Sequence, residues 1–387
     1  MNRSLRLTMV SALVTALACT GPREPEIGPE PMDIDTRTLA IAYDTGSQEL
    51  VLELPPVDLP AHASHEIEQP QPGEAIVPVG GWVQGYRVEV LDGSGNVVPR
   101  DVIHHVNIMA PGRRELFSPV MQRIGAVGHE TSPVVIPGIL GYPVEKGSRI
   151  LISAMLHNPT PASYHGVRIR VRFRYEQDDV IDPIDVFPFY MDVTPPATLH
   201  AFDLPPGRSD RSWEASPAVG GRILGVGGHV HQYAVSLTLF DVTADRVLYE
   251  TQPIRNEQGA VTGMAQDFFL LRLGIPLDRD HTYRLTVTYD NPTGETIAEG
   301  GMGALGGIFV PSRGAAWPAV DTGNAEYVKD YEIRITPHWT EMRGAPGHGG
   351  HQHRSSSSSS VRGQSSPSRR ENARSASSRP PVWQRAQ

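Results

Sequence analysis

Short runs of alternating apolar and polar residues, bounded by Gly, Pro, Asp or Asn, recur along the chain and predict β-strands. No run at helical spacing exceeds two turns. A first set of expected strands covers residues 38–43, 49–54, 82–91, 102–109, 149–156 and 167–175. A second set covers residues 222–231, 235–241, 246–251, 266–273, 282–290 and 331–337.

The two sets of strands are separated by Pro195-Pro196, which favours two domains. Asp92-Gly93-Ser94-Gly95-Asn96 predicts a hairpin turn inside the first set. Two antiparallel β-sandwiches fit this spacing. We expect an all-β fold with an N-terminal sandwich over residues 36–188 and a C-terminal sandwich over residues 189–342.

The composition agrees with strands and turns. The chain of 387 residues holds 38 Gly and 35 Pro, or 19% together, against about 12% in average proteins. A single cysteine excludes an internal disulfide framework, a four-cysteine zinc site and a CxxC redox motif. The 15 histidines are therefore the residues most able to carry chemistry.

Charge is distributed unevenly. The net charge of -9 combines a C-terminal segment, residues 343–387, of about +7 with a body of about -16. An acidic body excludes nucleic acid as the main partner, because phosphate binding needs clustered Lys and Arg. The segment is rich in Ser, Arg and His and low in apolar residues, so we expect a disordered tail.

The N-terminus has the pattern of an export signal. Arg3 and Arg6 precede an apolar run over residues 7–17, which ends in Ala16-Leu17-Ala18-Cys19. We expect a signal peptide over residues 1–19 of the bacterial lipoprotein type, with Cys19 lipidated. Ordinary cleavage, which leaves Cys19 as a free thiol, is the alternative. We expect residues 20–35 to form a flexible tether. The export signal predicts an exported protein that faces the periplasm or the cell surface and contacts a membrane only through Cys19.

Two histidine motifs stand out. In a strand, alternate residues share a face, so His229 and His231 project two imidazoles the same way. His104 and His105 are adjacent, and a twist or bulge would be needed to bring their rings together. Imidazole pairs suit copper, zinc, iron or nickel. Spacing alone also allows histidines that only make hydrogen bonds.

The order of motifs resembles a known family. The chain contains Ile-His-His-Val-Asn-Ile-Met over residues 103–109, Gly-Ala-Val-Gly-His-Glu over 125–130, Met-Leu-His-Asn-Pro over 155–159 and Gly-His-Val-His over 228–231. Tyr-Asp-Asn-Pro over 289–292 and Gly-Gly over 300–301 follow. This series resembles the copper type II, ascorbate-dependent monooxygenases over roughly residues 37–340.

The resemblance implies two jelly-roll-like sandwiches, each holding one copper, on opposite sides of a solvent-filled cleft that takes a small-molecule substrate. It assigns the electron-supplying copper to His104, His105 and His157. It assigns the catalytic copper, where dioxygen and substrate meet, to His229 and His231 with a methionine. An external reductant such as ascorbate supplies the electrons.

Three departures from the family pattern affect this assignment. The family's methionine would fall near Gly307 or Ile308, whereas this chain offers Met302. The family's disulfides cannot form. Gly227 replaces the arginine by which the peptide-amidating members bind a carboxylate, so peptide amidation is not expected.

Two other functions fit the same histidines. A non-catalytic copper- or ligand-binding lipoprotein on this scaffold, with a degenerate second metal site, is the main alternative. A hydrolytic zinc site at His229 and His231 is disfavoured, because no acidic residue accompanies the pair in the HExxH manner.

Overall fold

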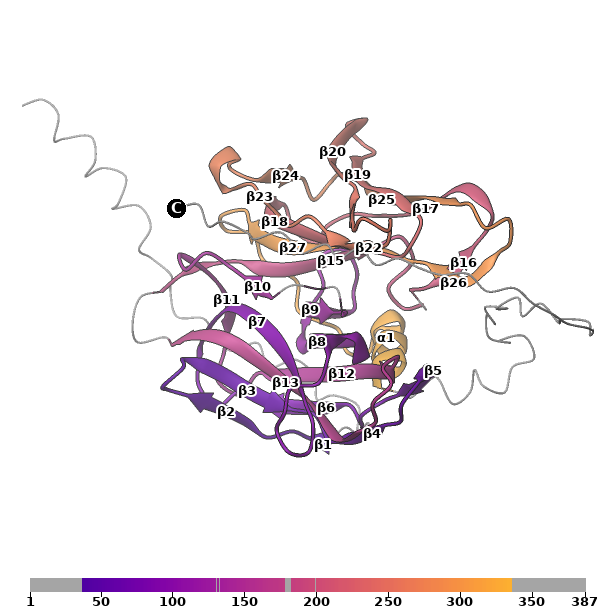
Figure 1. Ribbon diagram of the computed structural model, residues 1–387. Coiled ribbons are helices and arrows are strands. Elements are labelled where there is room, and N and C mark those ends of the chain that lie inside the picture. Colours follow the sequence, from indigo (N-terminus) through magenta and orange to yellow (C-terminus); the bar gives the residue numbers. More distant parts are fainter. Residues whose placement is uncertain (1–36, 130, 132, 178–181, 199, 336–387) are drawn as a thin grey trace, which may run out of the picture. The chain divides into compact units, whose positions relative to one another are not determined.

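The computed structural model describes residues 37–129, 131, 133–177, 182–198 and 200–335. These residues belong to one compact unit and form two jelly-roll-like β-sandwiches with one α-helix among them (Figure 1). The expected all-β fold is therefore confirmed. The segments expected to form a signal peptide, a tether and a disordered tail lie outside the described residues. No helix of the described part of the chain is both long and apolar enough to span a bilayer.

The first sandwich consists of two sheets. One sheet contains β1 (Arg37–Thr38), β5 (Ala63–Glu68), β6 (Gly73–Ile76), β8 (Ile103–Arg114), β9 (Met121–Val127) and β12 (Arg149–Asn158). The other contains β2 (Ile41–Asp44), β3 (Glu49–Glu53), β4 (Val57–Leu59), β7 (Gly81–Leu91), β10 (Val134–Val135), β11 (Leu140–Val144), β13 (Tyr164–Gln177) and β14 (Ile184–Asp185). Their orders are β1-β6-β12-β8-β9 and β14-β11-β7-β13-β3-β2. A short 3-10 turn, η1 (Arg100–Val102), precedes β8.

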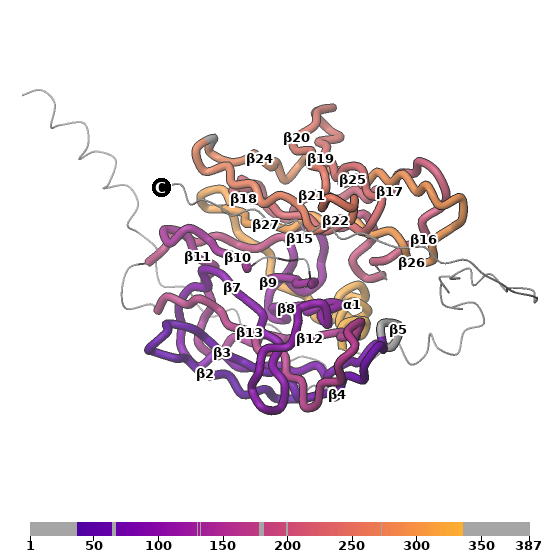
Figure 2. The backbone as a smooth tube through the Cα atoms, viewed as in Figure 1, coloured from indigo at the N-terminus to yellow at the C-terminus, as the bar shows by residue number. Residues whose placement is uncertain are grey.

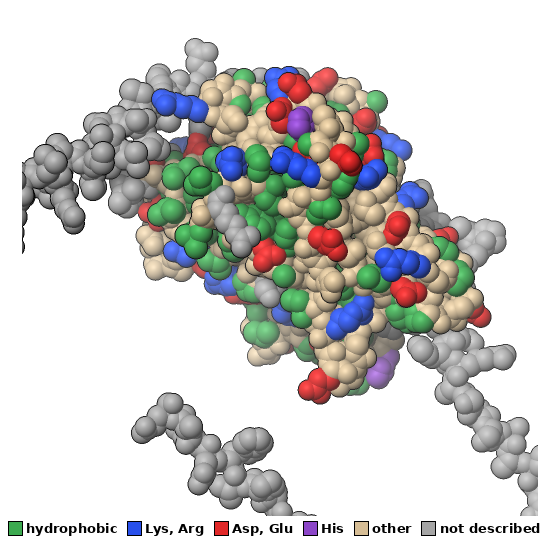
Figure 3. Space-filling view, turned by 90° about the horizontal axis from the view of Figure 1, so that it is seen from above, with side chains coloured by type: hydrophobic (Ala, Val, Ile, Leu, Met, Phe, Trp, Pro, Cys, Tyr) green, Lys and Arg blue, Asp and Glu red, His purple; other side chains and the backbone are tan. Residues whose placement is uncertain are grey.

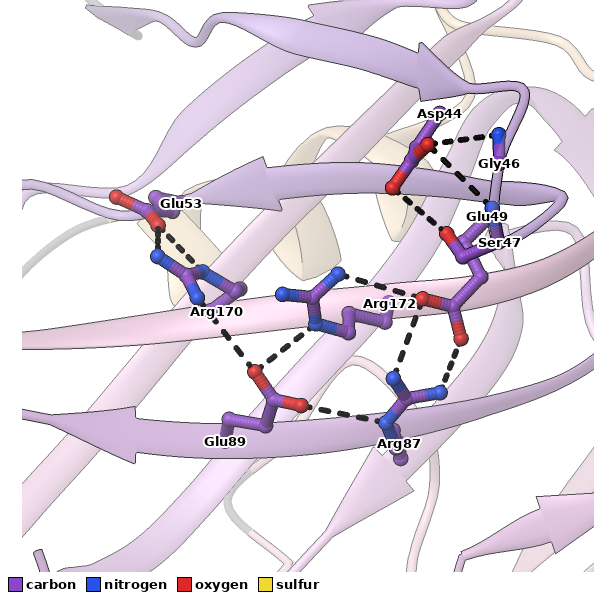
Figure 4. A network of polar contacts seen from close by, with 9 residues as sticks. All are labelled: Asp44, Gly46, Ser47, Glu49, Glu53, Arg87, Glu89, Arg170 and Arg172. Carbon is purple, nitrogen blue, oxygen red and sulfur yellow. Dashed lines mark hydrogen bonds and ion pairs between the residues drawn. The ribbon is translucent and has the colours of Figure 1, made fainter. Parts of the chain in front are cut away.

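Strand β13 shows why the sequence folds in this way. Val167, Ile169, Val171 and Phe173 are fully buried at alternate positions, and the residues between them point outward. On the outer face, arginines of β13 and β7 alternate with glutamates of β3 and β7 (Figure 4). This face is therefore held together by ion pairs, while the opposite face of the sheet forms the core.

The second sandwich also consists of two main sheets, and these contain fewer strands. One sheet contains β15 (Phe187–Asp192), β18 (Gly221–Val230), β23 (Asp267–Phe268), β24 (Ile275–Leu277) and β27 (Gly303–Pro311). The other contains β17 (Gly207–Ala215), β19 (Ala234–Asp241), β20 (Arg246–Thr251) and β25 (Tyr283–Asn291). Two further pairs are β16 (Phe202–Leu204) with β26 (Ile297–Gly301) and β21 (Pro253–Arg255) with β22 (Val261–Met264). Because β15 pairs with β27, this sandwich begins at Phe187.

The two sandwiches share one corner motif. Asn158 closes β12 and Asn291 closes β25, and each is followed by Pro and Thr. Each Asn donates through Nδ2 to three carbonyl oxygens, and its Oδ1 accepts from the amide and hydroxyl of the Thr. The carbonyls belong to Leu59, Pro60 and Ala162 in one sandwich and to Leu204, Pro205 and Glu295 in the other. Strands β12 and β25 therefore occupy corresponding positions.

Helix α1 (Ala325–Ile335) corrects the expectation that no helix exceeds two turns. It also replaces the strand expected at residues 331–337 as far as Ile335, and the last two of those positions lie outside the described residues. Asn324 accepts the Glu326 amide and caps the helix. Tyr327 and Tyr331 stack one turn apart and are buried against residues of β8, β9 and β12. Figure 2 shows α1 beside these strands of the first sandwich. The buried residues Tyr327, Asp330 and Tyr331 follow helical spacing. The apolar run was too short for this spacing to predict a helix from the sequence.

Two other local predictions have different outcomes. The turn at residues 92–96 is confirmed, because Asp92 Oδ1 accepts the amides of Ser94 and Asn96. The strand expected at residues 266–273 is wrong beyond Phe268. A 3-10 turn, η2 (Leu270–Arg272), follows, and Leu273 has a left-handed backbone with φ 57°.

Candidate metal centre

A β-bulge brings His104 and His105 together at the start of β8. The ladder between β8 and β12 pairs Met155 with His105 and Leu156 with Ile103, so His104 is the extra residue. The two rings meet edge to face with centroids 4.4 Å apart. The sequence predicts that a twist or bulge is needed to bring these two rings together, and the structure contains the bulge.

His157 lies near the end of β12 and completes the first group. Its ring centroid is 5.5 Å from that of His104. Its Nε2 lies 2.9 Å from the carbonyl oxygen of Asp101. Because a carbonyl only accepts, Nε2 carries the proton, and Nδ1 is the nitrogen with the lone pair.

Met155 also belongs to this group, although sequence reasoning did not select it. It pairs with His105 in the ladder, and it lies two residues before His157 on the same strand, so alternation places both on one face. That i, i+2 spacing was the available signal. A thioether therefore accompanies the first three histidines.

The second group lies at the end of β18. His229 and His231 have ring centroids 5.3 Å apart. The ladder with β27 pairs His229 with Ala304 and Val230 with Gly303. Continued by one position, this register sets His231 opposite Met302. The Tyr289 hydroxyl contacts the backbone of both His231 and Met302.

Gly307, one of the two positions near which the family's methionine would fall, has no room for a side chain in this fold. Gly307 pairs with Val226, and a Cβ at Gly307 would lie 2.1 Å from the Gly225 carbonyl oxygen. A methionine at position 307 would therefore not fit, whereas the ladder register brings Met302, the methionine that the sequence offers instead, next to the histidine pair.

The two groups meet at His105 and His229, whose ring centroids are 5.8 Å apart. The five rings thus form one continuous series in the order His157, His104, His105, His229 and His231. The rings of His105 and His229 are therefore adjacent at this point, whereas the resemblance implies a cleft between the two copper sites. Burial, with the neighbouring imidazoles of His104, His229 and His231, holds the pKa of His105 well below its ordinary value.

A buried polar group adjoins the second group. Tyr190 donates to Asp192 at 2.5 Å, and His200 Nδ1 lies 2.9 Å from the same carboxylate. Asp192 pairs with Ala304, which pairs in turn with His229. Asp192 and His229 therefore share one face of the sheet with only Ala304 between them. No pattern in the sequence connects these residues.

The donor set fits copper in its chemistry, because imidazole suits copper and a thioether favours Cu(I). The rings, however, stand edge to face. Within the described ranges, no group of three or more His, Cys, Asp or Glu side chains is arranged to hold a metal ion. Ring rotations would be needed before several histidines share one ion.

Two surface hollows lie away from the histidines. One of about 260 Å³ is lined by residues of β3, β7 and β13, among them Arg87 and Arg172. The other, of about 540 Å³, lies between β20 and β24. On the face of the second sandwich seen in Figure 3, hydrophobic side chains gather beside arginines. Phe268, Leu271 and Leu273 are among the exposed hydrophobic residues.

Comparisons with known proteins give no family. No protein-family model and no curated protein matches the chain. The major capsid protein P2 of bacteriophage PM2 matches with a TM-score of 0.32 and 12% identity, over 69% of this chain and 100% of that chain. A protein from Parabacteroides distasonis described as secreted matches with a TM-score of 0.19 and 9% identity, over 69% of this chain and 91% of that chain. A structure of infectious bursal disease virus, Gx strain, matches with a TM-score of 0.23 and 11% identity, over 76% of this chain and 78% of that chain. Likeness at these TM-scores carries no argument about function.

Proposed function

We propose that this chain is an exported copper protein of the type II monooxygenase kind, anchored to a membrane through Cys19. The observation that carries the proposal is the convergence of five histidines from three separate segments into one series of adjacent rings. Spacing along the chain did not require this convergence. The resemblance is the basis for the monooxygenase activity, and the imidazole and thioether donors support copper as the metal.

The residues divide into two sets by position. His104, His105 and His157 would hold the copper through which electrons enter. His229 and His231, with Met302, would hold the copper that faces dioxygen and substrate. Bound copper supplies one-electron chemistry toward dioxygen. The overall reaction converts C–H, dioxygen, two electrons and two protons into C–OH and water, with an ascorbate-like reductant as the electron donor.

The protein's own contribution is to keep the imidazoles in the form that binds metal. A ligating imidazole must be neutral, and the depressed pKa of His105 keeps that ring neutral at neutral pH. The Asp101 carbonyl fixes the tautomer and orientation of His157. The contact between the rings of His105 and His229 places the two sets of residues next to each other, so two bound coppers would lie close together.

The test is the metal content and reactivity of the mature chain. Protein loaded with copper and desalted should retain two coppers per chain, measured by elemental analysis. It should then consume dioxygen when ascorbate and a small organic substrate are both present. The variant H229A/H231A should lose the oxygen consumption. Absence of retained copper would contradict the proposal.

A non-catalytic copper- or ligand-binding role is the second candidate. It is favoured by the contact between His105 and His229, which leaves little room for substrate, and by the hollow between β20 and β24, away from the histidines. Copper retention without ascorbate-dependent oxygen consumption, across a panel of small aromatic and aliphatic substrates, would support this role.

A further inference from the structure

Tyr289 connects the two sheets of the second sandwich beside the histidine pair. Its ring is 1% exposed, and it belongs to β25, in the sheet opposite β18 and β27. Its hydroxyl accepts the amides of His231 and Met302, both at 3.0 Å. The same hydroxyl donates to the Met302 carbonyl at 2.5 Å. One side chain thus satisfies three backbone groups at two candidate ligand residues.

These bonds form where the ladder between the two strands stops. Strand β18 ends at Val230 and β27 begins at Gly303. His231 comes directly after Val230, and Met302 comes directly before Gly303. Both residues therefore lie outside the ladder, and regular pairing does not fix their positions relative to each other. The Tyr289 hydroxyl replaces the missing pair of ladder bonds, and it thereby sets the separation of the two residues.

The first sandwich shows that the fold itself does not require this hydroxyl. Tyr289 lies two residues before the corner residue Asn291, and Leu156 lies two residues before the equivalent Asn158. Leu156 is fully buried at its position. An apolar side chain is therefore enough to fill this site in a sandwich of the same design, and the hydroxyl is a specific addition next to the histidine pair.

We propose that Tyr289 is a positioning residue, whose hydroxyl holds the Met302 thioether beside the His231 imidazole so that both can bind one soft monovalent cation, Cu(I). This inference rests on the proposed function. Without the hydroxyl, the partly buried amides of His231 and Met302 lose their acceptor, and the end of the ladder separates. The thioether would then leave the ligand set, while the first histidine group would be unaffected.

The test uses Ag(I), a redox-inert analogue of Cu(I), and the mature chain labelled with ¹³C at the methionine methyl groups. In the unmodified protein, Ag(I) should shift the Met302 methyl resonance, which M302L identifies. In Tyr289→Phe the shift should vanish, and the affinity of the second group for Ag(I) should fall about tenfold, the equivalent of one hydrogen bond.

Tyr283→Phe is the matched control. Tyr283 is equally buried on the same strand, and its hydroxyl also bonds a backbone amide and a carbonyl, both of Asp278. Tyr283 lies six residues from Tyr289, about 20 Å along the strand. This variant should lose comparable stability and keep the Met302 shift. If Tyr289→Phe does not fold, Tyr289→Leu, the residue that the first sandwich uses, replaces it.

The outcomes separate the two proposals. An unchanged Met302 shift and affinity in Tyr289→Phe would overturn the positioning role, as would Ag(I) binding that leaves Met302 undisturbed in the unmodified protein. Absence of any Ag(I) or copper binding to the unmodified chain would overturn the proposed function, and the positioning role with it.

Discussion

Arg123 on β9 and Asp330 on α1 form a buried, two-pronged ion pair between positions 207 residues apart. The Arg123 side chain is 7% exposed and the Asp330 side chain is 0% exposed. Arg334, one turn further along α1, lies 3.4 Å from the same carboxylate and also bonds His200 of the second sandwich. A single carboxylate therefore connects the first sandwich, the helix and the second sandwich.

Replacement of Asp330 by Asn should destabilise the protein by about 3–5 kcal/mol, because two buried guanidinium groups lose their counter-ion. Urea denaturation would measure this loss. Glu332→Gln is the control, since Glu332 is an exposed carboxylate on the same helix and its loss should cost less than about 0.5 kcal/mol. Equal stability of the two variants would show that the ion pair contributes nothing to the junction.

The alternation of residues predicted most of the strands, because a sheet with one buried face imposes a period of two. In β13 every second residue from Val167 to Phe173 enters the core. The helix was not predictable in the same way. Its buried residues Tyr327, Asp330 and Tyr331 include a carboxylate that is paired inside the protein with Arg123, a residue far away in sequence.

The candidate site was predictable in part for a similar reason. Each histidine group depends on one strand or one pair of strands, so local spacing indicated it. The contact between His105 and His229 depends on how two sandwiches pack, and no local pattern encodes that. Met302 was placed only by the ladder register, which puts it beside His231 through a shorter loop than the family pattern implied.

Single histidine variants should show whether the series of rings holds two ions or one. His157→Ala should lower the retained copper by about one ion per chain, and His231→Ala should remove a different one, measured by elemental analysis and by Cu(II) spectra. His165→Ala is the control, because this histidine is 81% exposed and pairs only with Asp58. Loss of all copper from either ligand variant would indicate a single shared site.

Two adjacent glycines of β27 test why the chain has no methionine at the family's position. Gly307→Ala should destabilise the protein by about 1–3 kcal/mol or more, because its Cβ would meet the backbone oxygen of Gly225. Gly306→Ala should be close to neutral, since its Cβ would come no nearer than 3.6 Å to the Phe189 oxygen. Thermal denaturation of both variants would compare them. Equal melting temperatures would mean that the sheet can adjust at position 307.

Glu115 should make stability depend on pH near neutrality. Its carboxylate is buried where the sandwiches meet and accepts the amides of Leu116, Arg123 and Tyr190. Burial raises the pKa of Glu115 to about 7, although these amides and the Arg123 charge oppose the shift. In the unfolded chain the pKa is about 4.3. Between these values the folded protein keeps a proton that the unfolded chain releases, so stability is full below about pH 4.3 and falls as the pH rises toward 7.

The expected loss is on the order of 3 kcal/mol, and Glu115→Gln should remove it, because the amide cannot ionise. Urea denaturation at several values from pH 5 to pH 8 would give both curves, and the difference between them cancels the contribution of other titrating groups. The stability of the unmodified protein should fall relative to the variant as the pH rises. Parallel curves would show that Glu115 is already ionised in the folded protein at pH 5, with its charge stabilised by the three amides and Arg123.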